Sequence, residues 1–227
     1  MLEQEKLNTI SSFTSKILRK NFGKGPQSCQ SALCNKHLVI YIKGFISPME
    51  DVLMQQGQNT QVEKARSTII NIILEELKGV IEVTLDCDIE EQYHDWNFPN
   101  NSGVIMFVLN HEDQRNGGQP LINMTMLENE VARISVLVQK LPDEIKIHPI
   151  SATIYLVERK GILVPIEKAL ISKGFEEELR ITKDELEKEH FHRNGRFNDI
   201  FQKNVSDIFI DWNMREDKAL MAFVLST

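Results

Sequence analysis

The chain is poor in cysteine, with three among its 227 residues. Three cysteines are too few for a disulfide framework in a chain of this length. Cys29 and Cys34 lie close together, but no second pair of cysteines or histidines completes a zinc set. We interpret the two as half-buried thiols, and we expect the protein to have no metal and no cofactor.

The sequence also lacks a long apolar run. No stretch approaches the roughly 18 apolar residues that a membrane span needs. The first residues, Met1–Glu5, are acidic, whereas a signal peptide begins with basic residues and continues into an apolar region. We expect a cytoplasmic protein with no direct membrane span, peripheral to a membrane only through a partner.

Basic residues are in the minority, with 26 Lys and Arg against 33 Asp and Glu, which gives a formal net charge of −7. Because nucleic-acid binding requires a basic surface to neutralise phosphates, we expect no nucleic acid among the partners. What is present is ordinary for a globular protein, with 41% apolar and 26% charged residues. The length fits one large domain or two small ones.

The first half of the chain begins with an amphipathic pattern. Its apolar residues recur at three- and four-residue steps, which predicts a helix over 3–22: Leu7, Ile10, Phe13, Ile17 and Leu18. Glycines and a proline then end the helix. Two strands are predicted next, over 27–33 and 37–45. A second helix is predicted to begin at Ser47-Pro48, where the missing N–H of proline costs nothing.

A longer helix follows, with an apolar stripe from Val62 to Leu77, and Gly79 is predicted to end it. Apolar residues then alternate with polar ones, which predicts a half-buried strand over 80–88. A polar loop through Trp96 leads to a last strand over 104–109. Runs of strands separated by helices predict an α+β fold, in which helices cover one face of an antiparallel sheet of about four strands.

The pattern restarts after a polar stretch. A second amphipathic helix is predicted over 127–141, ended by Pro142. Three segments of the second half repeat segments of the first half: 161–167 repeat 44–50 at a spacing of 117 positions, 203–214 repeat 78–89 at a spacing of 125, and 223–225 repeat 107–109 at a spacing of 116.

The ordered repeats predict a tandem duplication of one small domain. The first copy is assigned to residues 1–112, a linker to 113–123, and a diverged second copy to 124–227. We expect two similar α+β domains related by pseudo-two-fold symmetry. Because fusing two protomers preserves a self-complementary contact, the copies are expected to form an intramolecular pseudo-dimer, and further oligomerisation remains open.

The segment Gly23-Lys24-Gly25 has two interpretations. The first is a glycine cap at the end of a helix, with Pro26 beyond it. The second is an anion-binding loop made by exposed amides and the Lys24 side chain. The spacing does not match a P-loop, which requires four residues between its first glycine and the Gly-Lys pair. We keep these three residues as tentative ligand-binding residues.

Asp86 and Asp88, with Glu82 nearby, form the second tentative site. On one face of a strand, paired carboxylates either perform acid–base chemistry or bind a divalent cation, or they form the wet face of a sheet. His190 and His192 resemble part of a metal site, but they lie in a stretch that is predicted as a charged helix, where this spacing points them apart. No nucleophile motif is present, so no catalytic residue is assigned.

Several of these motifs resemble those of the MpsC family, bacterial proteins named as part of a putative Na+-translocating, membrane-potential-generating system. The resemblance covers about residues 3–110. It rests on four segments: Phe22-Gly23-Lys24-Gly25-Pro26, Gly44-Phe45-Ile46-Ser47-Pro48-Met49-Glu50, Asp86-Cys87-Asp88-Ile89, and the strand 104–109. The second copy keeps Gly161, Pro165, Glu167 and Asp211 but lacks the Gly-Lys-Gly-Pro segment.

The resemblance implies association with a membrane Na+ or inorganic-carbon transport system, and it implies no established catalytic residues. We expect a non-enzymatic accessory or regulatory protein that binds a protein partner, such as a membrane transport complex. The alternative is a small-ligand or anion-binding module, or an enzyme, that uses the Gly23-Lys24-Gly25 loop together with the Asp86/Asp88 face. One functional surface, on the first copy, is expected.

Overall fold

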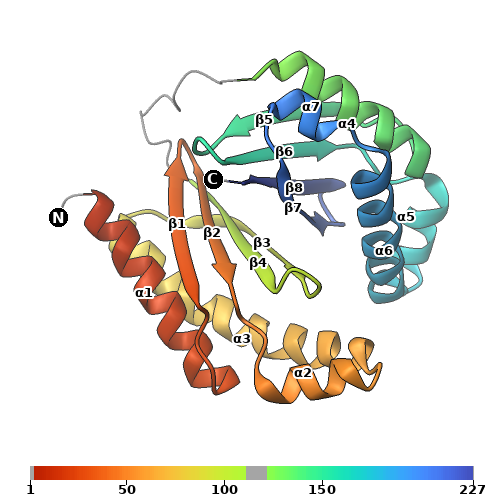
Figure 1. The fold of residues 1–227 in the computed structure, drawn as a ribbon. Helices are drawn as coiled ribbons and strands as arrows, with labels where there is room; N and C mark the ends of the chain where they lie inside the picture. The colour runs from red at the N-terminus through yellow and green to blue at the C-terminus, as the bar shows by residue number, and fades with distance from the viewer. Residues whose placement is uncertain (1–2, 111–121, 227) are drawn as a thin grey trace. The chain divides into compact units, whose positions relative to one another are not determined.

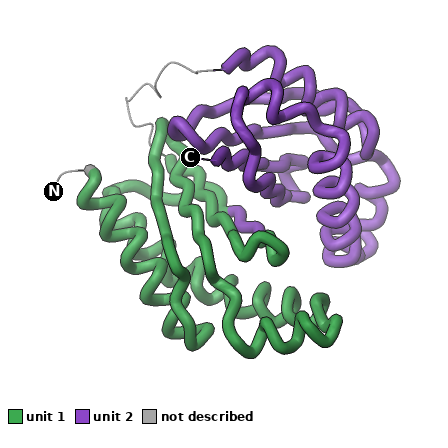
Figure 2. Tube along the Cα trace, viewed as in Figure 1, with its two compact units in different colours: residues 1–92, 96–114 green, residues 93–95, 115–227 purple. Residues whose placement is uncertain are grey.

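The fold is described by a computed structural model over residues 3–110 and 122–226. The predicted linker 113–123 lies almost wholly outside the described residues. Contacts between backbone positions divide the chain into two compact units (Figure 2). One unit comprises residues 1–92 and 96–114, and the other comprises residues 93–95 and 115–227.

Within the described residues, the first copy contains three helices and four strands (Figure 1). In chain order they are α1 (Glu3–Phe22), β1 (Ser28–Cys34), β2 (His37–Lys43), α2 (Pro48–Gln55), α3 (Asn59–Leu85), β3 (Ile89–Asn97) and β4 (Ser102–Leu109). The second copy follows the same order as α4 (Met124–Val138), β5 (Glu144–Pro149), β6 (Ile154–Lys160), α5 (Pro165–Ser172), α6 (Glu176–Asn194), α7 (Phe197–Phe201), β7 (Val205–Asn213) and β8 (Lys218–Leu225).

Both sheets have the same topology. The strand order is β1-β2-β4-β3 in the first sheet and β5-β6-β8-β7 in the second. The registers also correspond, because His37 pairs with Val108 in one sheet and Ile154 pairs with Val224 in the other. These pairings are antiparallel. The predicted fold class, two similar α+β domains with four-stranded antiparallel sheets, is therefore confirmed.

One face of each sheet packs against helices. In the first copy, alternate residues of β2 and β4 join the apolar faces of α1 and α3 in one buried cluster, which includes Leu38, Ile40, Ile10, Ile73 and Phe107. In the second copy the corresponding cluster joins α4, α6, α7, β6, β7 and β8. The period-two pattern of the strands and the 3.6-residue pattern of the helices thus meet in the same layer.

The helix exit at Gly23 has the geometry of a glycine cap. Gly23 adopts φ +73°, and its N–H donates to the carbonyl of Arg19 at 3.0 Å. Arg19 and Lys20 lie in the last turn of α1, where cations interact favourably with the helix dipole. Gly25 does not have a positive φ, so the left-handed residue of this segment is Gly23.

The predicted strand over 80–88 is wrong. Residues 59–85 form one continuous helix, α3, that runs through Gly79, and the next strand begins at Ile89. Ile81 is buried, but Val83 is 86% exposed, so the two do not share a face. A helix brings residues four positions apart onto one side. The spacing of Ile81 and Leu85 therefore fits a helix as well as the alternating pattern of a strand. Asp86 and Asp88 therefore follow a helix and do not lie on a strand.

The repeat at a spacing of 125 positions is also wrong. β7 corresponds to β3, so that Asp211-Trp212-Asn213 repeats Asp95-Trp96-Asn97 at a spacing of 116. The helix ends agree, because Asp86 and Gln202 both adopt the left-handed conformation after α3 and α7. The counterpart of Asp88 is thus Asn204, which shares its spacing of 116.

Three other features of the second copy differ from the sequence prediction. α4 ends at Val138 and not at residue 141. β5, at the edge of its sheet, was not predicted. The long helix of the first copy is divided here into α6 and α7, with Gly195 as the cap of α6. A Cβ at Gly195 would lie 2.1 Å from the Phe197 ring, so glycine is required where the chain turns.

Two glycines of the first copy, Gly23 and Gly79, should respond oppositely to alanine. A Cβ at Gly79 would meet no atom within 4 Å, and the position is helical. Gly79→Ala should therefore raise the free energy of unfolding by about 0.5–1 kcal/mol. Gly23→Ala should lower it, because φ is +73° there. Urea denaturation measures both, and a destabilised Gly79→Ala variant would contradict the continuous α3.

Candidate functional site

The first tentative site lies where α1 ends. The Lys24 ammonium donates to the carbonyl of Ile46 at 3.0 Å, which ties this segment to the loop before α2. The backbone N–H of Gln27 donates to the carbonyl of Lys43, at the end of β2. The Gly23-Lys24-Gly25 segment therefore sits at the end of the sheet where β1 begins and β2 finishes.

The second tentative site lies at the opposite end of the same sheet. The N–H of Asn110, just after β4, donates to the carbonyl of Asp88, and the Asn110 side chain bonds the Asp88 carboxylate at 2.9 Å. β4 runs antiparallel to β2, so its end lies beside the beginning of β2. The structure does not bring Lys24 together with Asp86 and Asp88. A ligand-binding role for these residues stays a prediction.

A different set of polar residues is buried at the start of α2. Ser47 caps this helix, and its hydroxyl accepts from the N–H of Glu50 at 3.3 Å. The Glu50 carboxylate accepts in turn from the N–H of Ser47 at 2.8 Å. This reciprocal arrangement is a capping box, which satisfies two helix N–H groups that would otherwise lack partners. Glu50 is the last residue of the segment that resembles the family motif.

Arg66 of α3 completes this arrangement. Its Nε donates to Glu50 Oε1 at 3.0 Å, and its Nη2 donates to both carboxylate oxygens at 2.6 and 2.8 Å. The two side chains are 1% and 8% exposed. Three rings surround the guanidinium, with centroids at 4.1 Å for Phe22, 4.2 Å for Phe45 and 4.9 Å for Trp96. Burial lowers the pKa of Arg66 against the opposing effect of the Glu50 charge.

The second copy repeats the pair with a lysine. Glu167 Oε2 accepts from the N–H of Val164 at 2.8 Å, and Lys183 of α6 lies 3.2 Å from Glu167 Oε1. Val164 has no hydroxyl, so only the glutamate half of the capping box remains. Lys183 also lies 5.8 Å from the centre of the Trp212 ring. The spacing of Glu167 and Lys183 is 16 positions, the same as the spacing of Glu50 and Arg66.

The second copy adds a second buried pair. Arg159 of β6 bonds Glu187 of α6 at 2.5 Å, and Glu187 also lies 3.1 Å from Lys183. Arg159 Nη1 donates to the Ser135 hydroxyl, and Trp212 Nε1 donates to Glu187 at 3.2 Å. We call Arg159, Glu167, Lys183 and Glu187 the buried charge network. Burial opposes the charge on Glu187, but Arg159 and Lys183 hold its pKa below the ordinary value.

The first copy has apolar residues at the corresponding positions. Ser135, Arg159 and Glu187 each lie 117 positions after a buried aliphatic residue, namely Leu18, Ile42 and Ile70. Three buried apolar positions of one core cluster in the first copy thus correspond to three hydrogen-bonded polar positions in the second. Replacing a buried ion pair with apolar residues of similar volume is often neutral for stability, so either solution can fill the site.

The comparison with family models agrees with this repeated geometry. The model described as "Na+-translocating membrane potential-generating system (MpsC)" matches residues 3–111 and again residues 127–227. The chain belongs to the MpsC family. It carries two MpsC domains in tandem, which confirms the duplication. No curated protein and no solved structure gives a significant match. None of the described helices has the length and apolarity that crossing a membrane requires.

The buried pair of each MpsC domain serves to hold elements together. Glu50 fixes the start of α2, and Arg66 binds it to the long helix α3; Glu167 and Lys183 do the same for α5 and α6. All four side chains are less than a tenth exposed, so a dissolved substrate cannot reach their charges. Sequence analysis missed Arg66 and Lys183. The signal that would have found them is the identical 16-residue spacing from the motif glutamate.

Each MpsC domain exposes an apolar residue beside its buried glutamate. Met49 is 72% exposed and Ile166 is 69% exposed, and they occupy the same position, 117 residues apart. Each follows the proline that begins its helix. A single exposed apolar side chain is ordinary, but the same exposure at the same motif position in two diverged copies indicates a surface that both domains present.

Proposed function

We propose that the chain is a non-enzymatic accessory or regulatory protein that binds a protein component of a membrane Na+ or inorganic-carbon transport system. Membership of the MpsC family supports the connection with a membrane Na+ system. In this proposal the protein is cytoplasmic and reaches the membrane through its partner. The pairing of the two copies as an intramolecular dimer stays a prediction that rests on the duplication alone.

The observation that carries the proposal is the difference in exposure between two neighbouring residues of the repeated motif. Its polar member, Glu50 or Glu167, is buried in an ion pair, and its exposed member, Met49 or Ile166, is apolar. A motif that builds a reaction centre would expose its polar groups to a substrate. A motif with a buried charge and an exposed apolar residue builds and positions a contact surface.

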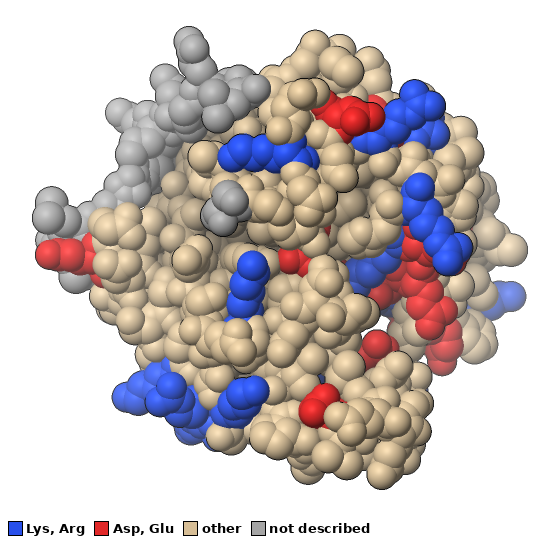
Figure 3. Space-filling model, in the orientation of Figure 1, with Lys and Arg blue, Asp and Glu red and all other residues tan. Residues whose placement is uncertain are grey.

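The charge distribution also fits a protein partner. Acidic and basic side chains are interspersed with broad uncharged areas on the face drawn in Figure 3, and neither sign covers it. A binding site for a polyanion would concentrate basic residues on one face. Protein contacts instead use uncharged centres with charged groups at the rim.

Affinity capture from native cells, with membranes solubilised, tests the proposal. The full chain should retain a membrane transport component, and Met49→Asp with Ile166→Asp should reduce the recovered amount about tenfold, the effect of losing about 1.4 kcal/mol of binding. Aspartate near a helix N-terminus is favourable, so the folded state should persist.

Val83→Asp is the matched control, because Val83 is at least as exposed as Met49 and Ile166 but lies outside the motif. It should leave recovery unchanged. Equal recovery by the wild-type chain and the double variant, both folded, would reject the motif surface as the contact.

A further inference from the structure

Among the described strands, β1 lies at an edge of the first sheet and pairs with β2 alone. Its register with β2 places Cys34 opposite His37 across a two-residue turn. Residues of an antiparallel strand alternate between facing the partner strand and facing away. The N–H of Ser31 donates to the Ser11 hydroxyl on α1, so Ser31 faces away from β2. Cys29 and Leu33, two residues to either side, therefore also direct their backbone groups to the open edge.

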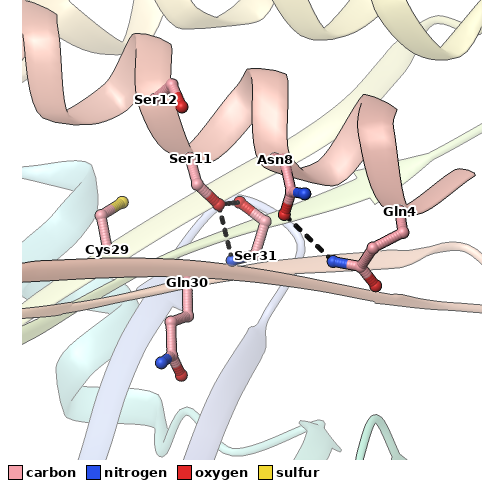
Figure 4. Close-up of a pocket in the computed structure, with 7 residues that line it drawn as sticks. All are labelled: Gln4, Asn8, Ser11, Ser12, Cys29, Gln30 and Ser31. Carbon is pink, nitrogen blue, oxygen red and sulfur yellow. Dashed lines mark hydrogen bonds between the residues drawn. The ribbon is translucent and has the colours of Figure 1, made fainter.

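The helix α1 runs beside this edge and leaves a hollow along it. The hollow has a volume of about 500 Å³. Its walls come from two elements (Figure 4): Gln4, Asn8, Ser11 and Ser12 of α1, and Cys29, Gln30 and Ser31 of β1. Ser11 points at Ser31 and donates to its hydroxyl at 2.8 Å, whereas Gln30 extends away from the helix. Within the described residues, no hydrogen bond takes up the N–H of Cys29 or of Leu33.

The lining carries no charge. None of its seven residues is acidic or basic, in a chain with 26% charged residues. Burial raises the pKa of the Cys29 thiol to about 11, so this group stays protonated and neutral at physiological pH. The groups offered to a ligand are therefore hydroxyls, amides and a thiol, together with backbone N–H and C=O groups.

The corresponding edge strand of the second copy, β5, differs from β1 in its residues. Ile145 and Ile147 of β5 occupy the positions of Cys29 and Ser31, 116 residues later, and they pack against the apolar core. The edge of β5 carries Glu144 and Lys146, which form an ion pair, and it ends in Pro149 at the position of Leu33. Charges and proline on an edge strand prevent it from pairing with another strand. β1 has neither, so these two barriers to pairing are absent from the edge strand of the first copy.

We propose that the groove between α1 and the edge of β1 binds an extended, uncharged polypeptide segment of a partner protein, which adds to the sheet as a further strand. The inference rests on the proposed function and adds a second contact surface on the first copy, in addition to the surface of Met49. Backbone hydrogen bonds to Cys29 and Leu33 supply the affinity, and the neutral lining selects against charged side chains. The N–H of Ser31 stays with Ser11, so only the carbonyl of Ser31 joins the new ladder.

A random dodecapeptide library displayed on phage, panned against the full chain, tests this proposal. Enriched peptides should lack Lys, Arg, Asp and Glu, and a synthetic copy should slow hydrogen exchange at the Cys29 and Leu33 amides. Leu33→Pro, which installs the residue of β5, should weaken the peptide at least about tenfold because it removes one of the two free donors.

Leu33 also packs against the core, so a second variant is needed in case the proline disturbs folding. Gln30→Lys places the lysine of β5 on the side of the strand that faces away from α1. Because a charge on an edge strand disfavours pairing with a further strand, this variant should also weaken the peptide severalfold. The reciprocal Lys146→Gln is the control and should have no effect.

Peptides that bind Gln30→Lys and Leu33→Pro as tightly as the wild-type chain, or that protect amides elsewhere, would overturn the proposal, as would a library that yields no binder. The proposed function is tested separately: if folded Leu33→Pro and Gln30→Lys still recover the membrane component, that function stands and the groove is rejected.

Discussion

Replacing Arg159 by isoleucine is expected to lower the free energy of unfolding by about 3–5 kcal/mol, the cost of leaving a buried charge without its partner. Arg159 and Glu187 are 1% and 0% exposed. Without Arg159, Glu187 keeps the Trp212 N–H and Lys183, and this lysine also serves Glu167. Glu187→Ile should be similarly damaging, because it leaves the guanidinium buried without a carboxylate.

The combined variant should behave differently. Ser135→Leu with Arg159→Ile and Glu187→Ile installs the three residues that the first copy has at these positions. The first copy shows that the fold accepts the apolar set, with all three side chains buried. The triple variant should be neutral or more stable than the wild type, by up to about 4 kcal/mol. Urea denaturation measures it, and a triple variant less stable than either single variant would contradict the expectation that the apolar set can replace the polar set.

The same variants should differ in their response to acid. The pKa of Glu187 is lowered in the folded protein, so the unfolded chain binds this proton more readily. The stabilisation is fully present above the unfolded value of about 4.3 and is lost as the pH falls below it. Between about pH 5 and pH 3 the wild type should therefore lose more stability than the triple variant.

Arg66→Leu should have an effect of the same size in the first copy. It leaves Glu50 buried without its bidentate partner and removes the cation from between three rings, so a loss of about 3–5 kcal/mol is expected. Arg66→Lys, which installs the residue of the second copy, should lose less because it keeps the charge but not the bidentate geometry. Urea denaturation distinguishes the two. A change within about 0.5 kcal/mol for Arg66→Leu, the range of an ordinary surface substitution, would contradict its architectural role.

The fold class and the duplication were predictable because they depend on local patterns. The helix over 3–22 is confirmed by α1, and the capped start of the second helix at Ser47-Pro48 is confirmed by α2. The prediction of a strand over 80–88 was wrong because its apolar residues also fit a helix. Ile81 and Leu85 lie four positions apart, so they share one side of a helix. The misplaced strand then concealed the identical Asp-Trp-Asn segments of β3 and β7, which are the clearest repeat in the chain.

The buried ion pairs were not predictable from composition or periodicity. Glu50 was noted as part of a motif, but Arg66 lies on another helix and appears in the sequence as an ordinary charged residue. Only the three-dimensional packing of α2 on α3 shows that it is buried. The network of Arg159 and Glu187 is hidden for the same reason, since a strand residue and a helix residue 28 positions apart carry no local signature.

The central claim is that the buried charges of the two MpsC domains build the scaffold and that the exposed surface performs the function. Capture of the membrane component by two folded variants, measured side by side, tests it most directly. The triple variant Ser135→Leu, Arg159→Ile, Glu187→Ile should recover as much partner as the wild type, and Met49→Asp with Ile166→Asp should recover about a tenth. Loss of capture by the triple variant with full capture by the surface variant would contradict the account.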